Sequence, residues 1–143
     1  MFSKEESKKI RQEFWTNFGK KYPRKWLLYN TKIKDLSLKF TFDTKIAQVS
    51  IDIESPDDFM RSYYFDKLIS LKNIIKTDYL PNIVFDENYS LDNGKIVSRI
   101  YVELDDNVSI HNKHTWERTM DFLNKKMNLL EFFFIEYKDF IED

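Results

Sequence analysis

Apolar and polar positions recur with two different periods along the chain, and each period predicts a different kind of element. Before residue 22, apolar side chains return every four positions, which places them on one face of a helix. A serine and a glutamate three residues apart precede this stripe and form a capping box, a common signal for a helix start. A helix over residues 4–21 is therefore expected from Ser3, Glu6, Ile10, Phe14 and Phe18.

The period changes to two after residue 25, which is typical of half-buried strands. Residues 36–42 and 47–53 both alternate apolar with polar side chains, and residues 43–45 between them supply a turn. The short apolar and aromatic segment 26–31 predicts a further strand ahead of this hairpin. Three consecutive strands are therefore expected after the first helix.

A second helix is expected over residues 56–76. A serine, a proline and two acidic residues at 55–58 match the preferences of a helix N-terminus, and apolar residues keep helical spacing behind them. Two more alternating segments follow at residues 83–91 and 96–104, joined through an Asn-Gly pair. An Asn-Gly pair between alternating segments is the strongest short-range signal for a β-hairpin.

The last helix is expected from about residue 112 to residue 141, after a short apolar segment at residues 108–110. Its apolar positions alternate by four and three, as in a coiled-coil seam, and a second apolar stripe lies beside the first. A single seam cannot cover so wide a face, which predicts a surface for self-association. The candidate interaction surface comprises Trp116, Met120, Phe122, Leu129, Phe133 and Phe140.

Together these elements predict a single α+β domain over residues 1–143, in the order α-β-β-β-α-β-β-α. We expect a mostly antiparallel, twisted sheet of five to six strands, packed with three helices of which the C-terminal one is long. The order of the strands within the sheet stays open.

Composition excludes more chemistry than it identifies. The chain has no cysteine and only two glycines, which excludes thiolate chemistry and the glycine-rich loops that bind phosphate. The charged N-terminus and the absence of a long apolar run predict a cytoplasmic protein that does not enter a membrane. No cofactor-binding pattern is present in the sequence, so no cofactor is expected.

Several stretches of the chain carry a resemblance to a known family. They are FSKEE at residues 2–6, RQEFW at 11–15, Phe18-Gly19, SRIYVEL at 98–104, and Asn112-Lys113 ahead of Trp116. Over nearly the whole chain the sequence resembles a bacterial family, the domain of unknown function numbered 4268. In that family the domain occurs alone and also as a tail on larger proteins, some of them nuclease-like. The resemblance implies a fold and a bacterial setting, and it transfers no activity, ligand or catalytic residue.

Two groups of residues are compatible with metal chemistry. Residues 43–45, with Asp35 and Asp52 nearby, are similar to the carboxylates and lysine with which restriction-type nucleases hold a divalent ion. The favoured alternative is that residues 43–45 are simply the solvated turn of a hairpin. His111 and His114 lie three residues apart, but no third ligand accompanies them, which favours a surface pair. No catalytic or metal-binding residue is therefore assigned.

Charge is distributed unevenly, although the whole chain has a formal net charge of only -1. Residues 1–46 carry 12 Lys and Arg against 5 Asp and Glu, and the remainder carries 11 against 19. Aromatic residues lie among the basic ones, and nucleic-acid surfaces use these two chemistries for phosphates and bases. The favoured alternative is that the aromatic residues belong to the core and the lysines coat the surface. The candidate nucleic-acid or ligand contacts are Arg11, Lys20, Lys21, Arg24, Lys25, Trp26, Arg99 and Tyr101.

Arg99 is expected to project from the polar face of its strand, opposite Ile100 and Val102 and alongside Tyr101. An acidic group from the first or second helix is its expected partner. A structural ion pair is the default interpretation, and an arginine that anchors a ligand between sheet and helix is the alternative.

The sequence leads to two main functional hypotheses. The favoured one is a non-enzymatic interaction module that forms a homodimer and has room for a protein partner; enzymatic activity stays open but is less favoured. The alternative is a nucleic-acid-associated or degenerate nuclease-like domain that uses the basic N-terminal third. A third hypothesis, a small-molecule pocket between sheet and helices, has no residue pattern in its favour.

Overall fold

A computed structural model describes residues 2–143, and within them four strands form one antiparallel sheet. The strands are β1 (Leu36–Phe42), β2 (Ala47–Ile53), β3 (Val84–Ser90) and β4 (Ile96–Glu103). Their order is β1-β2-β4-β3, so the two predicted hairpins are present and β2 joins them by pairing with β4. The α+β class is confirmed, whereas the expected five to six strands are too many.

The helices are α1 (Lys4–Lys21), α2 (Asp58–Ser70), α3 (Lys72–Asp78) and the long C-terminal α4 (Trp116–Glu142). A short 3-10 turn, η1 (Lys113–Thr115), leads into α4. The expectation of three helices is therefore wrong by one, counting residues 2–143.

The expected helix over residues 56–76 divides into two because the backbone at Leu71 departs from helical geometry, with φ −95° and ψ 5°. Its start also differs from the expectation at Ser55. The side chain of Asp57 is the N-cap, and it accepts a hydrogen bond of 2.9 Å from the backbone N–H of Phe59. An aspartate fills this position well because its charge meets the positive end of the helix dipole.

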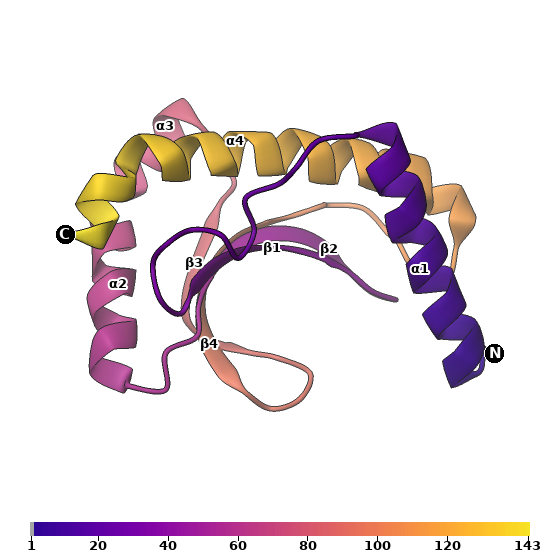
Figure 1. Ribbon diagram of the computed structural model, residues 1–143, viewed down its shortest axis with the longest axis horizontal. Coiled ribbons are helices and arrows are strands. Elements are labelled where there is room, and N and C mark those ends of the chain that lie inside the picture. The colour runs from indigo at the N-terminus through magenta and orange to yellow at the C-terminus, as the bar shows by residue number, and fades with distance from the viewer. Residues whose placement is uncertain (1) are drawn as a thin grey trace.

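The sheet is curved into an arch (Figure 1). Helix α4 crosses the convex side of the arch, and α1 and α2 lie at its two ends. Because α4 packs on the apolar face of the strands, the polar face of the sheet is the concave one.

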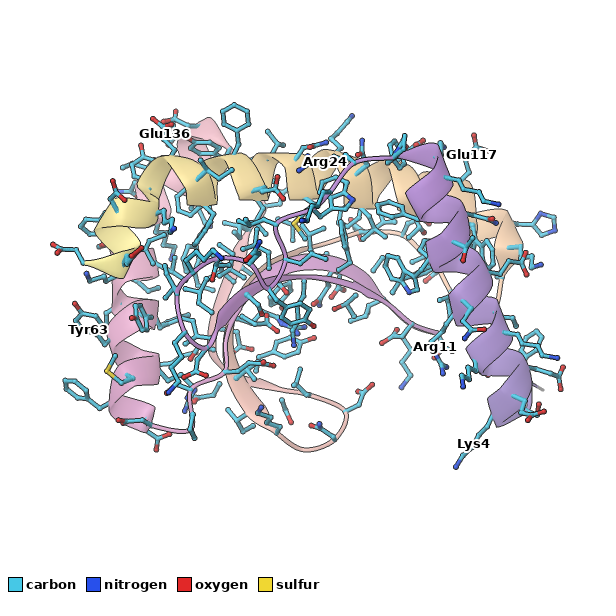
Figure 2. The ribbon with its side chains drawn as sticks, viewed as in Figure 1. Lys4, Arg11, Arg24, Tyr63, Glu117 and Glu136 are labelled. Atoms are coloured by element: carbon cyan, nitrogen blue, oxygen red, sulfur yellow. The ribbon has the colours of Figure 1, made fainter. Side chains whose placement is uncertain are left out.

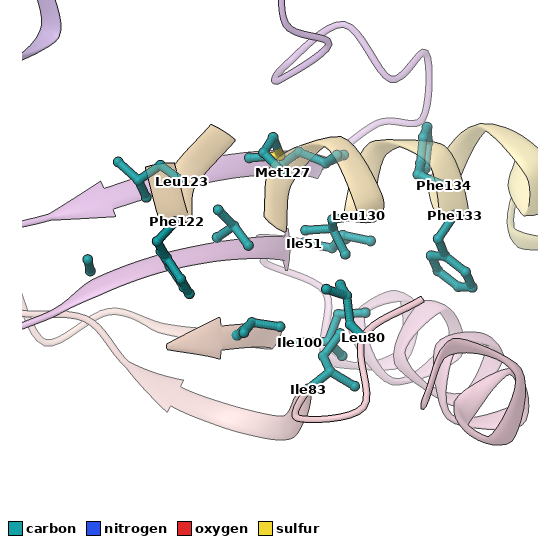
Figure 3. Close-up of a cluster of buried hydrophobic side chains, with 14 of the residues drawn as sticks. Ile51, Leu80, Ile83, Ile100, Phe122, Leu123, Met127, Leu130, Phe133 and Phe134 are labelled. Atoms are coloured by element: carbon teal, nitrogen blue, oxygen red, sulfur yellow. The ribbon is translucent and has the colours of Figure 1, made fainter. Parts of the chain in front are cut away.

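The hydrophobic core lies between the sheet and α4 (Figure 3). Ile51 of β2 pairs with Ile100 of β4, and both are buried beneath Leu123, Met127 and Leu130 of α4. Burying side chains of this size contributes roughly 1.5–3 kcal/mol each relative to leaving them exposed. The alternation predicted for β1, β2 and β4 therefore places their apolar side chains on the face of the sheet that packs against α4.

The wide apolar face of α4 is largely covered within the monomer, which corrects the expectation of a free interaction surface. The sheet covers one side of the helix, while α1 and the segment after α3 cover the flanks: Phe14 contacts Trp116, and Tyr79 contacts Phe133. Of the six residues proposed for this surface, Phe140 is exposed and Leu129 is half-buried. The other four, Trp116, Met120, Phe122 and Phe133, are buried.

Residues 26–31, expected to form a strand, form a loop. A single backbone hydrogen bond, from the N–H of Leu38 to the carbonyl of Leu28, links this segment to β1. Leu28 has a positive φ of 44°, which is incompatible with an extended strand. The apolar segment 108–110 is likewise outside the sheet, although Ile110 donates a backbone hydrogen bond to Asp43.

Across residues 2–143, no helix is both long enough and apolar enough to cross a bilayer.

Candidate nucleic-acid interface

Polar side chains line the concave face of the sheet, although several of them are buried. Alternation along three paired strands brings these side chains together, because β1, β2 and β4 are paired in register. The layer consists of Ser37, Lys39, Thr41, Gln48, Ser50, Asp52, Arg99, Tyr101 and Glu103.

Arg99 and Asp52 form the centre of this layer. The guanidinium donates through Nε to Oδ1 at 2.7 Å and through Nη2 to Oδ2 at 2.8 Å, which is a bidentate ion pair. Both side chains are almost fully buried. Burial acts to lower the pKa of Arg99, but the hydrogen bonds and charge of Asp52 outweigh burial, so this pKa is raised. The default interpretation of Arg99 as a structural ion pair is confirmed, with a partner from a neighbouring strand instead of a helix.

A second set of hydrogen bonds extends from Arg99 toward the end of the sheet. Its Nη1 donates to Gln48 at 3.0 Å, and the amide nitrogen of Gln48 donates to Glu103 at 2.8 Å. The ring of Tyr89 stacks on the guanidinium, whose central carbon lies 4.3 Å from the ring centroid. Tyr101 lies in contact with Tyr89, 5.5 Å between ring centroids. Arg99 is therefore held by the protein and leaves little for a ligand, whereas Tyr101 is half-buried.

Toward the β1 edge, Lys39 and Glu54 form a partly exposed ion pair. Lys39 Nζ donates to Glu54 Oε1 at 2.8 Å and lies 3.6 Å from the carboxylate of Asp52. Burial acts to raise the pKa of Glu54, but the hydrogen bond and charge of Lys39 prevail, so this pKa is lowered. For Lys39, burial opposes the charged form, but the bond to Glu54 and the charge of Asp52 prevail and raise its pKa. Both groups are charged at neutral pH.

The loop at residues 28–35 runs beside this edge in an unusual backbone conformation. Leu28, Lys32 and Asp35 have φ values of 44°, 66° and 64°, and within residues 2–143 these are the non-glycine residues with positive φ. Such conformations cost free energy and are often found at functional sites. Thr31 supports the loop from inside, because its hydroxyl bonds to the backbone of both Ile33 and Leu36.

Four depressions adjoin one another from α1 past the β1 edge to the start of α2, and we call this series the edge groove. The first, about 640 Å³, lies on α1 and shares Trp15 with the second, about 290 Å³. Tyr29 lines both the second and the third, which is about 410 Å³. Lys34 and Asp35 line both the third and the fourth, which is about 400 Å³. Each depression therefore shares at least one lining residue with the next one.

Basic and aromatic side chains both line the edge groove, together with the carboxylates of Asp35, Glu54 and Asp57. The cations are Lys8, Arg11, Lys32, Lys34 and Lys39, and the aromatic rings are Trp15, Tyr29 and Phe40. Of these five cations, only Lys39 has an ion-pair partner within residues 2–143. The ring of Tyr29 is 74% exposed, which is far more than a core tyrosine would be. The four unpaired cations and the ring of Tyr29 are therefore free to meet a ligand, whereas Trp15 and Phe40 are half-buried.

The structure divides the predicted nucleic-acid contacts into separate places. Arg11 lies on the side of α1 that faces the arch, whereas Arg24 lies against α4 (Figure 2). Arg24 binds the buried carboxylate of Glu131 and stacks on Trp26, with its guanidinium carbon 3.9 Å from the ring centroid. Lys21 pairs with Asp121 of α4 at 3.2 Å. Lys21, at the end of α1, and Arg24, just after it, therefore hold this part of the chain against α4. Of the three residues, only Arg11 lines the edge groove.

Three other predicted contacts do not join Arg11. Lys20 and Lys25 are exposed and line none of the four depressions. Trp26 is half-buried, with its ring against Phe18 and Phe40. Trp26 therefore packs against the core, as the favoured alternative predicted for the aromatic residues of the basic N-terminal third.

The suspected metal residues do not form one site. The carboxylate of Asp43 accepts hydrogen bonds from the backbone N–H groups of Lys45 and Ile46, as expected of a turn residue. In the part of the chain that the structure describes, no three Asp, Glu or His side chains are placed to hold a metal ion. His111 contacts Ser7 through Nε2, 3.1 Å from the hydroxyl, and its ring lies against that of Phe2 in a tilted arrangement.

Sequence reasoning missed the residues on which the edge groove depends. Ser37, Lys39 and Glu54 were visible as polar positions in alternating segments, which places them on one face. Tyr29 was one of the aromatic residues that the sequence placed among the basic ones, but residues 26–31 were expected to form a strand, so its exposed position on a loop was not predicted.

Comparison with known proteins gives a family and no activity. A family model described as "Domain of unknown function (DUF4268)" matches residues 10–138. The chain belongs to this family, which confirms the resemblance seen in the sequence. Neither the curated proteins nor the solved structures include a match to the chain.

Proposed function

We propose that this domain is a non-enzymatic module that binds single-stranded nucleic acid along the edge groove. The observation that carries the proposal is that four cations without an ion-pair partner within residues 2–143, Lys8, Arg11, Lys32 and Lys34, line the same series of depressions as Trp15, Tyr29 and Phe40. Cations attract phosphates, and bases stack on aromatic faces, with a gain of roughly 1–3 kcal/mol for each base.

The arrangement of the rings favours a single strand over a duplex. Tyr29 stands on the loop at residues 28–35, and Trp15 is held on α1 by contacts with Phe14 and Phe18. Rings of this kind reach the faces of bases only when the bases are unstacked. The depression on α1 is the positive end of the groove. Lys8 and Arg11 line it, and no carboxylate is among its lining residues.

Fluorescence anisotropy with labelled oligonucleotides of about 12 nucleotides would test the proposal, because such a length spans one small binding domain. Single-stranded and duplex DNA and RNA would be compared across a salt series. We expect single strands to bind more tightly than duplexes, and we expect binding to weaken steadily as salt is added. A chain that binds no oligonucleotide at low salt would refute the proposal.

Self-association is a second candidate function, and a different observation favours it. Phe132 and Ile135 lie three residues apart on α4 and are 69% and 62% exposed. Residues three apart are neighbours on a helix, so these two side chains form one apolar spot. Light scattering across a concentration series tests this candidate, and a monomer at every concentration would contradict it.

A further inference from the structure

We infer that the outer edge of β1, at residues 38–40, is a docking site for an extended acidic peptide that pairs with it as an added strand. The inference goes beyond the proposed function, because it rests on main-chain groups that the nucleic-acid proposal does not use. β1 is the outermost strand on its side of the sheet, with β2 as its neighbour. An edge strand presents main-chain N–H and C=O groups with which a further strand can pair.

The direction of the main-chain groups along β1 follows from one hydrogen bond. The N–H of Leu38 donates to the carbonyl of Leu28 in the loop at residues 28–35, so it points away from β2. In an antiparallel ladder, residues alternate between facing their neighbouring strand and facing away from it. Phe40 lies two residues beyond Leu38 and therefore also directs its N–H and C=O outward. Its partner in the register, Val49, exchanges no main-chain hydrogen bond with it.

The outward groups of Phe40 have no partner in the part of the chain that the structure describes. Within residues 2–143, no hydrogen bond outside the β1–β2 ladder reaches its N–H or its C=O, nor the outward C=O of Leu38. Leu36 differs, because its N–H bonds to the carbonyl of Ile33 and its C=O accepts from the hydroxyl of Thr31. The loop therefore completes the edge at Leu36 and leaves it open beyond the N–H of Leu38.

The depression of about 290 Å³ lies along this open edge. Leu38, Lys39 and Phe40 all line it, although the side chains of consecutive strand residues point to opposite faces of the sheet. The outer edge is the side that all three residues share, so the depression adjoins their main chain. Trp15 of α1 and Tyr29 of the loop line it as well. An added strand would lie about 4.8 Å from β1.

The aromatic wall favours an apolar residue at the centre of the peptide. The rings of Trp15 and Phe40 are in contact, with 5.9 Å between their centroids, so Trp15 lies on the face to which Phe40 points. Side chains of directly paired residues lie on the same face of a sheet. The peptide residue that pairs with Phe40 therefore meets Trp15.

The neighbouring charges favour acidic residues beyond that centre. Lys8 and Arg11 line the adjoining depression on α1, which has no carboxylate among its lining residues. Carboxylates of a bound peptide would meet these two cations, whereas a basic peptide would be repelled. A second copy of the chain fits less well, because pairing two β1 edges would bring Lys8 and Arg11 of both copies to one surface.

Hydrogen exchange of single main-chain amides, followed by NMR, tests the site directly. The probe is a synthetic peptide of about seven residues, with valine at its centre, threonine on either side and glutamates at both ends. We expect saturating peptide to slow exchange of the Phe40 amide about tenfold or more, because this N–H gains a partner. The Leu38 amide is the internal control and should change far less, since it is already bonded to Leu28. A peptide that does not bind, or that binds and leaves exchange at Phe40 unchanged, overturns the inference.

Fluorescence anisotropy with labelled peptides, each methylated at one main-chain nitrogen, tests the pairing from the other side. Each methyl group removes one donor and keeps the side chain. We expect binding to weaken about tenfold at alternate positions only, because every second N–H of a strand faces its neighbour and its loss leaves an acceptor unpaired. Equal effects at every position would mean that side chains alone hold the peptide, which overturns the added strand.

The acidic character of the partner is tested by replacing the peptide's glutamates with glutamines. We expect weaker binding, and we expect Lys8→Gln with Arg11→Gln in the protein to reduce the difference between the two peptides. Lys72→Gln with Lys125→Gln removes the same charge outside the groove and should retain the difference. A glutamine peptide that binds as tightly as the glutamate peptide overturns the assignment of an acidic partner.

Three outcomes separate this inference from its alternatives. If the peptide binds and no oligonucleotide does, the inference stands and the proposed function fails; the reverse result removes only the inference. If both bind, they should compete, because both would use Lys8 and Arg11, and simultaneous binding would overturn the acidic contacts. A Phe40 amide that becomes protected when protein concentration rises without peptide would assign the edge to a second copy and overturn the inference.

Discussion

Arg99 and Asp52 bind each other through two parallel hydrogen bonds across the β2–β4 pairing, and neither residue is more than 3% exposed. Each charge is tolerated in the sheet only because the other lies beside it. Removing one partner leaves an unpaired charge in a place that water does not reach, which costs far more than losing an exposed ion pair. The polar layer of the concave face is therefore as important to the fold as the apolar face.

The first prediction follows for Asp52. Asp52→Ala should lower the free energy of unfolding by roughly 3–5 kcal/mol, because the guanidinium of Arg99 stays buried without its anion. Urea unfolding followed by tryptophan fluorescence measures the loss. Glu13→Gln is the control, since it breaks an exposed pair with Lys113 and should change stability little. A loss as small as that of the control would mean that Arg99 reaches solvent readily.

The second prediction concerns acid. A carboxyl whose pKa is lower in the folded protein than in the unfolded chain binds fewer protons when folded. Its stabilising contribution is complete above the ordinary value of 4.5 and is lost as the pH falls through the lowered pKa of Glu54. Glu54→Gln should therefore be less stable than the wild type at neutral pH and should lose less on acidification. Urea midpoints between neutral pH and about pH 3 measure this difference. Parallel curves for the two proteins would contradict it, and Asp92→Asn in the β3–β4 turn is the control.

The hairpins could be predicted closely because their signals are local. Strands β1 and β2 begin and end at the residues where the alternation begins and ends. Gly94 adopts a φ of 85° in the turn between β3 and β4, a conformation that favours glycine. Each of these features depends on neighbours within a few residues.

The loop at residues 28–35 could not be predicted because distant residues shape it. Of its three positive-φ residues only Asp35 is of a type that favours this conformation, and Leu28 and Lys32 are not, so the sequence signal is weak. The carboxylate of Glu131 on α4 accepts a hydrogen bond from the backbone N–H of Leu27 and also binds Arg24. These contacts fix the entrance to the loop, and they join residues about a hundred positions apart. The edge groove depends on this loop, so the basic and aromatic character of the region could be predicted but the arrangement of its residues around the groove could not.

The face of α4 shows a related difficulty. The periodicity gave the position and width of the apolar stripes correctly, but periodicity does not say what covers them. Phe133 is covered by Tyr79, which lies beyond the point where the expected second helix divides.

The third prediction tests the electrostatic part of the edge groove. Each phosphate neutralised by a cation contributes about 0.7 to the salt dependence of single-strand binding, expressed as the slope of log affinity against log salt. Replacing Lys8 and Arg11 together with glutamine should reduce that slope by about 1.4 and weaken binding to every sequence alike. Lys72→Gln with Lys125→Gln removes the same charge outside the groove and should leave the slope nearly unchanged. An equal loss in both double variants would show that total charge matters and the groove does not.

The last prediction concerns the apolar spot on α4. If Phe132 and Ile135 mediate self-association, the wild-type mass measured by light scattering should rise with protein concentration. Phe132→Glu with Ile135→Glu should hold the protein as a monomer, because charged side chains resist burial between two copies. The melting temperature of this variant at low concentration should be close to that of the wild type, since both side chains are largely exposed in the monomer.

Phe59→Glu supplies the control, because Phe59 on α2 is 74% exposed and its loss tests whether any exposed ring has the same effect. Association that survives the α4 double variant but is lost in Phe59→Glu would move the interface to α2. A double variant that melts much earlier would mean that Phe132 and Ile135 stabilise the monomer itself. Only a loss of association with unchanged melting identifies the spot as an interface, since exposed apolar side chains cost a monomer little and gain free energy chiefly when a second surface covers them.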